Sequence, residues 1–155
     1  MPGQAQVQFD IAAIVDGDIP ANPTINNVTD DDLIFFGWLQ GDNNFIENRF
    51  GNESQKFAVN LNGTGSNTSA GTDLFYIQVY YRTRNNGGAW GAWTVIGQDA
   101  YMQKNAAGSQ SFELTRYITL ALTGDDDVQF SAGFSKGVGG TVAVDGAQIT
   151  VTASN

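Results

Sequence analysis

The side chains of this chain that are best suited to binding lie on either side of a glycine-rich turn. Residues 85–88 (Asn-Asn-Gly-Gly) separate two runs that are rich in aromatic residues, which is a strong signal for a β-hairpin. Exposed aromatic rings can stack on sugars or pack against a protein partner, while Arg supplies hydrogen-bond donors. The candidates for contact with a ligand or partner are Tyr80, Arg82, Arg84, Trp90 and Trp93.

Side chains for catalysis are scarce in this sequence. It contains no His and no Cys, which excludes His-dependent triads, thiolate nucleophiles and disulfides, and makes zinc or copper sites improbable. Glycoside hydrolysis needs two acids several ångströms apart across a cleft. The acids available for such a pair are Asp10, Glu47, Glu53, Asp73 and Glu113. None of them lies in an aromatic cleft motif, so we interpret them as solvated acids and predict no enzyme activity.

Two acidic triplets, residues 30–32 and 125–127, each precede an apolar run. Calcium prefers carboxylate and carbonyl oxygens, which neighbouring loops at one end of a β-sandwich could supply together. Asp is also common at the solvated start of a strand. We therefore predict no cofactor, with structural calcium as the alternative.

The formal net charge is −9, and the seven Lys and Arg residues are scattered along the chain. Such a chain is repelled by nucleic acid and by anionic membranes, so neither is expected as a partner. The first residues lack the basic and apolar regions of a secretory signal, and no apolar run is long enough to span a bilayer. We expect synthesis in the cytosol, unless a signal peptide has been trimmed.

Alternation of apolar and polar residues recurs along the whole chain and is typical of half-buried β-strands. The strands are predicted at residues 5–11, 33–39, 56–61, 74–83, 89–96, 111–122, 128–134 and 141–152, and residues 62–72 are predicted to form a loop. Asp145-Gly146 predicts a second hairpin inside the last run. Arg116 falls among apolar residues of the same parity, which indicates either a β-bulge, the interpretation we favour, or a buried partner for its charge.

One predicted strand, residues 33–39, is apolar on both faces. Such a strand lies at the centre of a sheet, or one of its faces meets another subunit. Its candidates for an intersubunit or sheet-packing core are Leu33, Ile34, Phe35, Phe36, Trp38 and Leu39.

The number and spacing of these strands predict an all-β chain. With eight or nine antiparallel strands, glycine-rich turns and no convincing helical periodicity, we expect a two-sheet β-sandwich that is jelly-roll-like. We expect one domain over residues 1–155, with residues 1–5 as an N-terminal arm. Periodicity alone leaves the strand order open.

In three respects the chain resembles the small β-sandwich proteins of bacteriophage virions, namely capsid decoration (cement) proteins and the head domains of fibres and receptor-binding proteins. The resemblance rests on the absence of His and Cys, on loops rich in Asn, Gly, Ser and Thr, and on the strand-ending run at residues 140–153. It implies a non-enzymatic structural protein, a homotrimer that binds capsid protein on the virion surface and is made in the host cytoplasm. The alternative is a lectin-like module or receptor-binding head that binds a glycan, and a small glycosidase ranks last.

Overall fold

The regular elements of the described residues are nine β-strands. The computed structural model describes residues 4–15, 17, 19, 33–35, 45–47, 54–67, 73–84, 88–103, 109–121, 127–137 and 141–154. The strands are β1 (Gln4–Ile11), β2 (Leu33–Phe35), β3 (Phe45–Glu47), β4 (Ser54–Asn67), β5 (Asp73–Arg84), β6 (Thr94–Gln103), β7 (Ser109–Ala121), β8 (Asp127–Lys136) and β9 (Val142–Ser154). Within the same residues, no helix has the length and apolar character needed to cross a bilayer.

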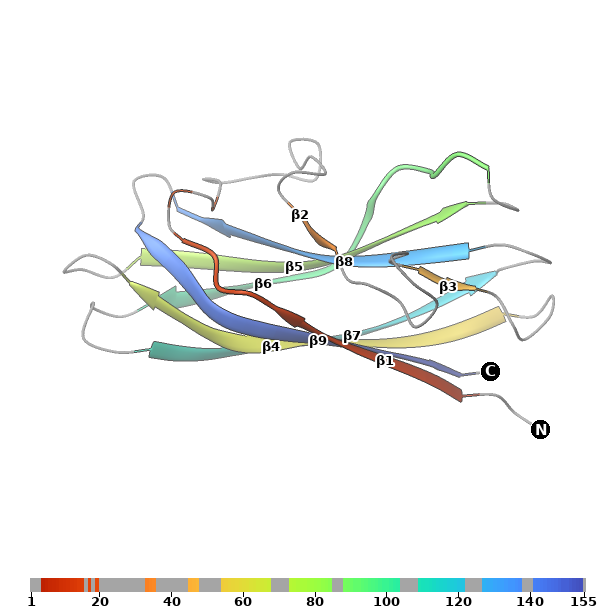
Figure 1. The fold of residues 1–155 in the computed structure, drawn as a ribbon, viewed down its shortest axis with the longest axis horizontal. Coiled ribbons are helices and arrows are strands. Elements are labelled where there is room, and N and C mark those ends of the chain that lie inside the picture. Colours follow the sequence, from red (N-terminus) through yellow and green to blue (C-terminus); the bar gives the residue numbers. More distant parts are fainter. Residues whose placement is uncertain are drawn as a thin grey trace.

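The strands form two antiparallel sheets that lie face to face (Figure 1). Sheet A has the order β1-β9-β4-β7, and sheet B has the order β2-β8-β5-β6, with β3 also paired to β8. β2 and β3 pair with successive stretches of β8, so they act as two pieces of one strand. Counted that way, the first strand pairs with the last, and successive strands alternate between the sheets except at the β5–β6 hairpin. This is the jelly-roll arrangement of two Greek keys, so the predicted fold class is confirmed.

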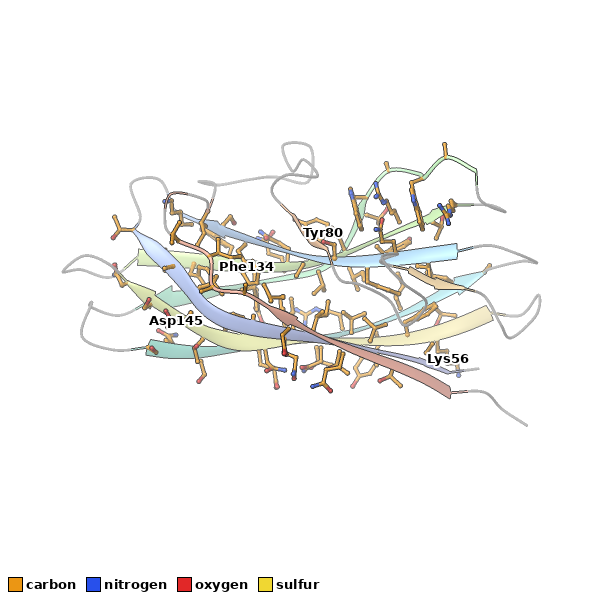
Figure 2. The ribbon with its side chains drawn as sticks, viewed as in Figure 1. Lys56, Tyr80, Phe134 and Asp145 are labelled. Atoms are coloured by element: carbon orange, nitrogen blue, oxygen red, sulfur yellow. The ribbon has the colours of Figure 1, made fainter. Side chains whose placement is uncertain are left out.

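The core lies between the sheets and is filled mainly by alternate residues of β4, β5, β7, β8 and β9, as the sequence pattern predicted. Phe75, Phe112 and Phe134 form an aromatic cluster that joins the two sheets, with ring centroids 5.5 to 6.0 Å apart. Phe57 and Phe130 make a second contact between the sheets at 5.1 Å. Figure 2 shows Phe134 pointing into this space. Each aromatic pair adds about 0.5–1.5 kcal/mol to the stabilisation from burial.

The prediction of a loop from residue 62 is wrong for residues 62–67, which continue β4. This polar stretch is extended because β4 lies inside sheet A and pairs with β7 on one side and β9 on the other. Two sets of ladder hydrogen bonds outweigh the weak strand propensity of Asn and Gly. Residues 68–72 lie outside the described part of the chain.

The hairpin predicted at Asp145-Gly146 is also wrong, because β9 runs without reversal from Val142 to Ser154. Thr64 pairs with Gly146 and Gly65 with Val144, which leaves Asp145 as the extra residue of a β-bulge. The close approach of the two strands at this point requires a glycine at position 63. A Cβ on Gly63 would lie 2.7 Å from the Cα of Ala147 and closer still to the carbonyl oxygen of Gly146.

The bulge predicted near Arg116 is absent, since β7 pairs with β4 in unbroken register from Ser109 to Ala121. Arg116 therefore shares the inward row with Leu114 and Ile118, and its side chain is half-buried. Its stem lies over Gly97 of β6, and one guanidinium nitrogen donates a hydrogen bond to the carbonyl oxygen of Thr115 at 2.9 Å. The prediction of a bulge is therefore wrong. The alternative, a buried partner for the charge of Arg116, stays a prediction, and the hydrogen bond that the structure shows is to a backbone carbonyl.

Two further boundaries differ from the prediction. β6 begins at Thr94, and residues 88–93 have no regular structure, although a strand was predicted from residue 89. β1 takes in Gln4 and Ala5, which pair with Ser154 and Ala153 of β9, so these two residues are not part of a free arm. Residues 1–3 lie outside the described part.

Candidate functional site

Four of the five predicted contact residues come together on the outer side of sheet B. Arg82 and Arg84 alternate with Tyr81 and Thr83 on β5, and Tyr81 packs against the core, so the two arginines belong to the opposite face. The segment that carries Trp90 and Trp93 returns along β5, where the N–H of Gly91 donates to the carbonyl oxygen of Thr83 at 2.8 Å.

The arginines and tryptophans alternate in contact. The Cζ of Arg82 lies 4.3 Å from the ring centroid of Trp93 and 5.2 Å from that of Trp90. The Cζ of Arg84 lies 4.5 Å from the Trp90 centroid. These distances are those of cation–π contacts, each stabilising by about 0.5–2 kcal/mol depending on exposure. We call these four half-buried residues the arginine–tryptophan cluster.

Arg82 is also held from β8, because its Nε donates to Oε1 of Gln129. Gln129 stands directly across from Arg82 in the β5–β8 register. A guanidinium keeps its charge at all ordinary pH values and carries several N–H donors in one plane. The cluster can therefore hold a partner surface by stacking and hydrogen bonding, but it offers no group that could exchange a proton during a reaction.

Tyr80, the fifth predicted contact residue, is buried. It is 2% exposed, and burial raises the pKa of its phenol from 10.0 to about 12. It belongs to the face of β5 that carries Gln78 and Arg82, on the other side of sheet B from Phe134 (Figure 2).

The outer side of sheet B holds a buried polar row that the sequence did not reveal. Gln78 on β5 is 2% exposed, and Ser131 and Ser135 on β8 are 0% and 1% exposed. The Nε2 of Gln78 donates to Oγ of Ser135 at 3.2 Å and lies 3.4 Å from Oε1 of Gln98 on β6. Polar residues that alternate with core residues are normally solvated, so no sequence signal separates this row from an exposed face.

The predicted intersubunit strand is placed only in part. Leu33, Ile34 and Phe35 form β2, which pairs with β8 and stands at the end of the sheet order rather than at its centre. β2 is therefore not the central strand that one of the two alternatives predicted. A contact with another subunit remains a prediction for these residues. Phe36, Trp38 and Leu39 lie outside the described residues.

The acids considered for hydrolysis do not pair where the structure describes them. Asp10 and Glu113 lie in one row across sheet A, with Gln148 of β9 and Asn62 of β4 between them. Three strand spacings put these acids about 14 Å apart, beyond the 5–9.5 Å range of glycosidase carboxylates. Oδ1 of Asp10 accepts a hydrogen bond from Gln148 at 3.1 Å.

For the other acidic residues considered for hydrolysis, the structure gives only the strand that carries them or does not describe them. Glu47 and Asp73 lie in sheet B, on β3 and β5, and Glu53 lies outside the described part. In the described ranges no three acidic residues are grouped so that they could hold a metal ion. Residues 30–32, 125 and 126 lie outside those ranges, and Asp127 begins β8, so the calcium alternative stays a prediction.

The fold and these contacts define a jelly-roll β-sandwich with a cluster of arginine and tryptophan side chains on one sheet. No family model matches the chain, and no curated protein matches it. Among solved structures, a structure of infectious bursal disease virus, Gx strain, matches 99% of this chain with a TM-score of 0.54 and 8% identity. This chain spans 32% of the viral chain, about a third of its length.

Two other structures are similar at lower scores. The T13 particle of infectious bursal disease virus gives a TM-score of 0.43 and 11% identity over 99% of this chain and 35% of the other. The dimeric latent PorU of Porphyromonas gingivalis gives 0.42 and 12% identity over 96% of this chain and 12% of the other. Of these three structures, only the Gx-strain structure has a TM-score above 0.5. Because its sequence identity is low, the similarity shows a shared fold and nothing more.

Proposed function

We propose that this chain is a non-enzymatic structural protein of a virion, a decoration (cement) protein that binds capsid protein on the outer surface of the shell. We further propose that it acts as a homotrimer and stabilises the shell. The observation that carries the proposal is the jelly-roll strand order of this chain, together with the match of 99% of its length to a structure of infectious bursal disease virus at a TM-score of 0.54. Viral capsid proteins are among the main users of this architecture.

The chemistry of the arginine–tryptophan cluster supports a role in binding a protein partner. Trp and Arg are the residue types most enriched where protein interfaces concentrate their binding energy. Two of the seven cations of a chain with net charge −9 lie in this cluster, so it is a local exception on an acidic protein. A capsid surface that carries carboxylates opposite the two arginines is the complementary partner.

A lectin role at the same cluster is the second candidate. Sugar stacking needs an accessible aromatic face. In the cluster the guanidinium of Arg82 lies over both Trp90 and Trp93, and that of Arg84 lies over Trp90. A sugar would have to use the opposite faces of these half-buried rings or displace an arginine, so the contacts favour protein binding here.

Co-sedimentation with shells tests the proposal. The purified chain is mixed with shells of the virus that encodes it, prepared without this chain, and bound copies are counted by quantitative mass spectrometry. Saturable binding in threes is expected, and Trp93→Ala should weaken it about tenfold or more, as the loss of an interface anchor does. Light scattering should give a mass near three times 16.6 kDa, about 50 kDa. Absence of shell binding at saturating concentration contradicts the proposal.

A further inference from the structure

The outer face of sheet A carries rows of polar side chains. Antiparallel register sets Gln8, Thr150, Asn60 and Thr115 side by side across the four strands. The next row holds Asp10, Gln148, Asn62 and Glu113. These are the outward residues, since the intervening Val59, Leu61 and Leu114 are buried in the core. The face offers amide and hydroxyl groups with few charges.

Part of this array is fixed in a chain of hydrogen bonds. Nδ2 of Asn62 donates to Oδ1 of Asn60 at 2.7 Å, and Nδ2 of Asn60 donates to Oγ1 of Thr115 at 2.8 Å. Both amides and the Thr115 hydroxyl are held in place by these hydrogen bonds. A ligand therefore meets donors and acceptors that are already positioned, which lowers the entropy cost of binding.

Beside this chain stands the most exposed large apolar side chain of the described residues. Tyr117 on β7 is 79% exposed, and it lies two residues from Thr115 on the same face. Ala58 of β4 is its partner across the ladder, and Thr152 of β9 lies beyond Ala58 in that row. Because both neighbours are small, the phenol ring has an open flank on the sheet.

At the other end of the array the surface is hollowed. An open hollow of about 650 Å³ is lined by Asn62, Gly63, Thr64, Ser111, Phe112 and Glu113 of β4 and β7. Glu113 lies four residues from Tyr117 along β7, which is about 13 Å in a strand. The ring of Tyr117, the amides of Asn60 and Asn62, and the hollow thus follow one another along β4 and β7.

We propose that this strip, from Tyr117 through Asn60, Thr115 and Asn62 to Glu113, is a binding site for a neutral oligosaccharide. A sugar ring stacks on Tyr117, and the next ring reaches the amides and the hollow, where the Glu113 carboxylate accepts hydrogen bonds from hydroxyl groups. The carboxylates of Glu113 and Asp10 and the net charge of −9 disfavour sialylated or sulfated glycans. The site is separate from the arginine–tryptophan cluster and does not depend on shell binding.

Titration of the full chain with defined sugars tests this site. Maltotriose, cellotriose and the trimer of N-acetylglucosamine serve as neutral probes, and sialyllactose is the anionic comparison. Saturation-transfer NMR and calorimetry should detect at least one neutral probe and no sialyllactose. Tyr117→Ala should weaken that binding about tenfold or more, and Tyr117→Phe, which keeps the ring, should retain it within about threefold.

Trp93→Ala is the matched control on the other sheet, and it should leave sugar affinity unchanged. Circular dichroism and the unfolding midpoint of each variant show whether the fold is retained. Asn60→Ala, which removes the middle of the hydrogen-bond chain without touching the ring, should also reduce affinity. Failure of all three neutral probes overturns the proposal, as does binding that survives Tyr117→Ala and Asn60→Ala but is lost in Trp93→Ala.

Discussion

The side chain of Arg116 on β7 crosses Gly97 on β6, so one arginine joins the edge strands of the two sheets. A Cβ at position 97 would lie 2.5 Å from Cγ and 2.6 Å from Nε of Arg116. β6 and β7 are the last strands of their sheets and lie against each other on this side of the sandwich. The arginine stem lies over Gly97, while the guanidinium donates a hydrogen bond to the carbonyl oxygen of Thr115.

This relationship predicts a strong coupling between the two positions. Gly97→Ala should lower the free energy of unfolding by about 1–3 kcal/mol, because the stem of Arg116 must leave its place. In an Arg116→Ala background the same change should be neutral or slightly stabilising, since Ala suits a strand better than Gly. Urea unfolding of the four proteins measures the coupling. Equal costs in the two backgrounds would contradict the contact.

Gly63 and Gly146 lie near each other at the β4–β9 bulge, but the space for an added methyl group differs between them. Gly63→Ala should destabilise the fold by about 3 kcal/mol or more, since the added methyl group would meet backbone atoms of Gly146 and Ala147 that cannot rotate away. Gly146→Ala meets nothing within 4 Å and should cost little. Thermal unfolding monitored by circular dichroism compares them, and a tolerated Gly63→Ala would refute the close approach.

The buried phenol of Tyr80 predicts a loss of stability at high pH. Its pKa is about 12 in the fold and 10.0 in the unfolded chain. Between these values the folded protein binds more protons than the unfolded one, so the free energy of unfolding falls as pH rises, and below pH 10 the contribution is constant. Urea midpoints at about pH 9 and about pH 11 should therefore drop less in Tyr80→Phe than in the natural chain. Equal drops would show that Tyr80 ionises freely.

The arginine–tryptophan cluster predicts an interaction energy between Arg82 and Trp93. A double-mutant cycle with Arg82→Met and Trp93→Leu should give a coupling of about 0.5–2 kcal/mol, because these changes remove the cation–π contact and keep apolar bulk. Lys56→Met is the matched control, since Lys56 is an exposed cation on sheet A (Figure 2). Lys56 and Trp93 should show no coupling energy. A coupling energy near zero between Arg82 and Trp93 would contradict the cation–π contact that defines the cluster.

Strand positions and the core could be predicted because they depend on local alternation. Phe75, Ile77 and Val79 alternate along the strand predicted at residues 74–83, and all three are 0% exposed in the core. The order of the strands could not be predicted, because any pairing of such strands buries their apolar faces. Residues 62–67 of β4 show the same limit, since their polar composition forms a strand only where β7 and β9 hold both edges.

Prediction of the candidate sites was limited in a similar way. The hairpin sequence brings Arg82, Arg84, Trp90 and Trp93 together because these residues are close in sequence, and their contact with a ligand or partner stays a prediction. The strip on sheet A was missed because Tyr117 and Asn60 are far apart in sequence and become neighbours only through the β4–β7 register. Burial of Tyr80 was missed because tyrosine occurs both on surfaces and in cores.

Heat resistance of shells tests the central claim, that this chain is a stabilising structural component of a virion. Particles prepared without the chain are heated with and without the purified protein, and release of the genome is followed with a nucleic-acid dye. The account predicts that bound protein raises the release temperature, and that a variant such as Trp93→Ala that binds weakly raises it less. An unchanged release temperature at saturating bound protein would contradict the account.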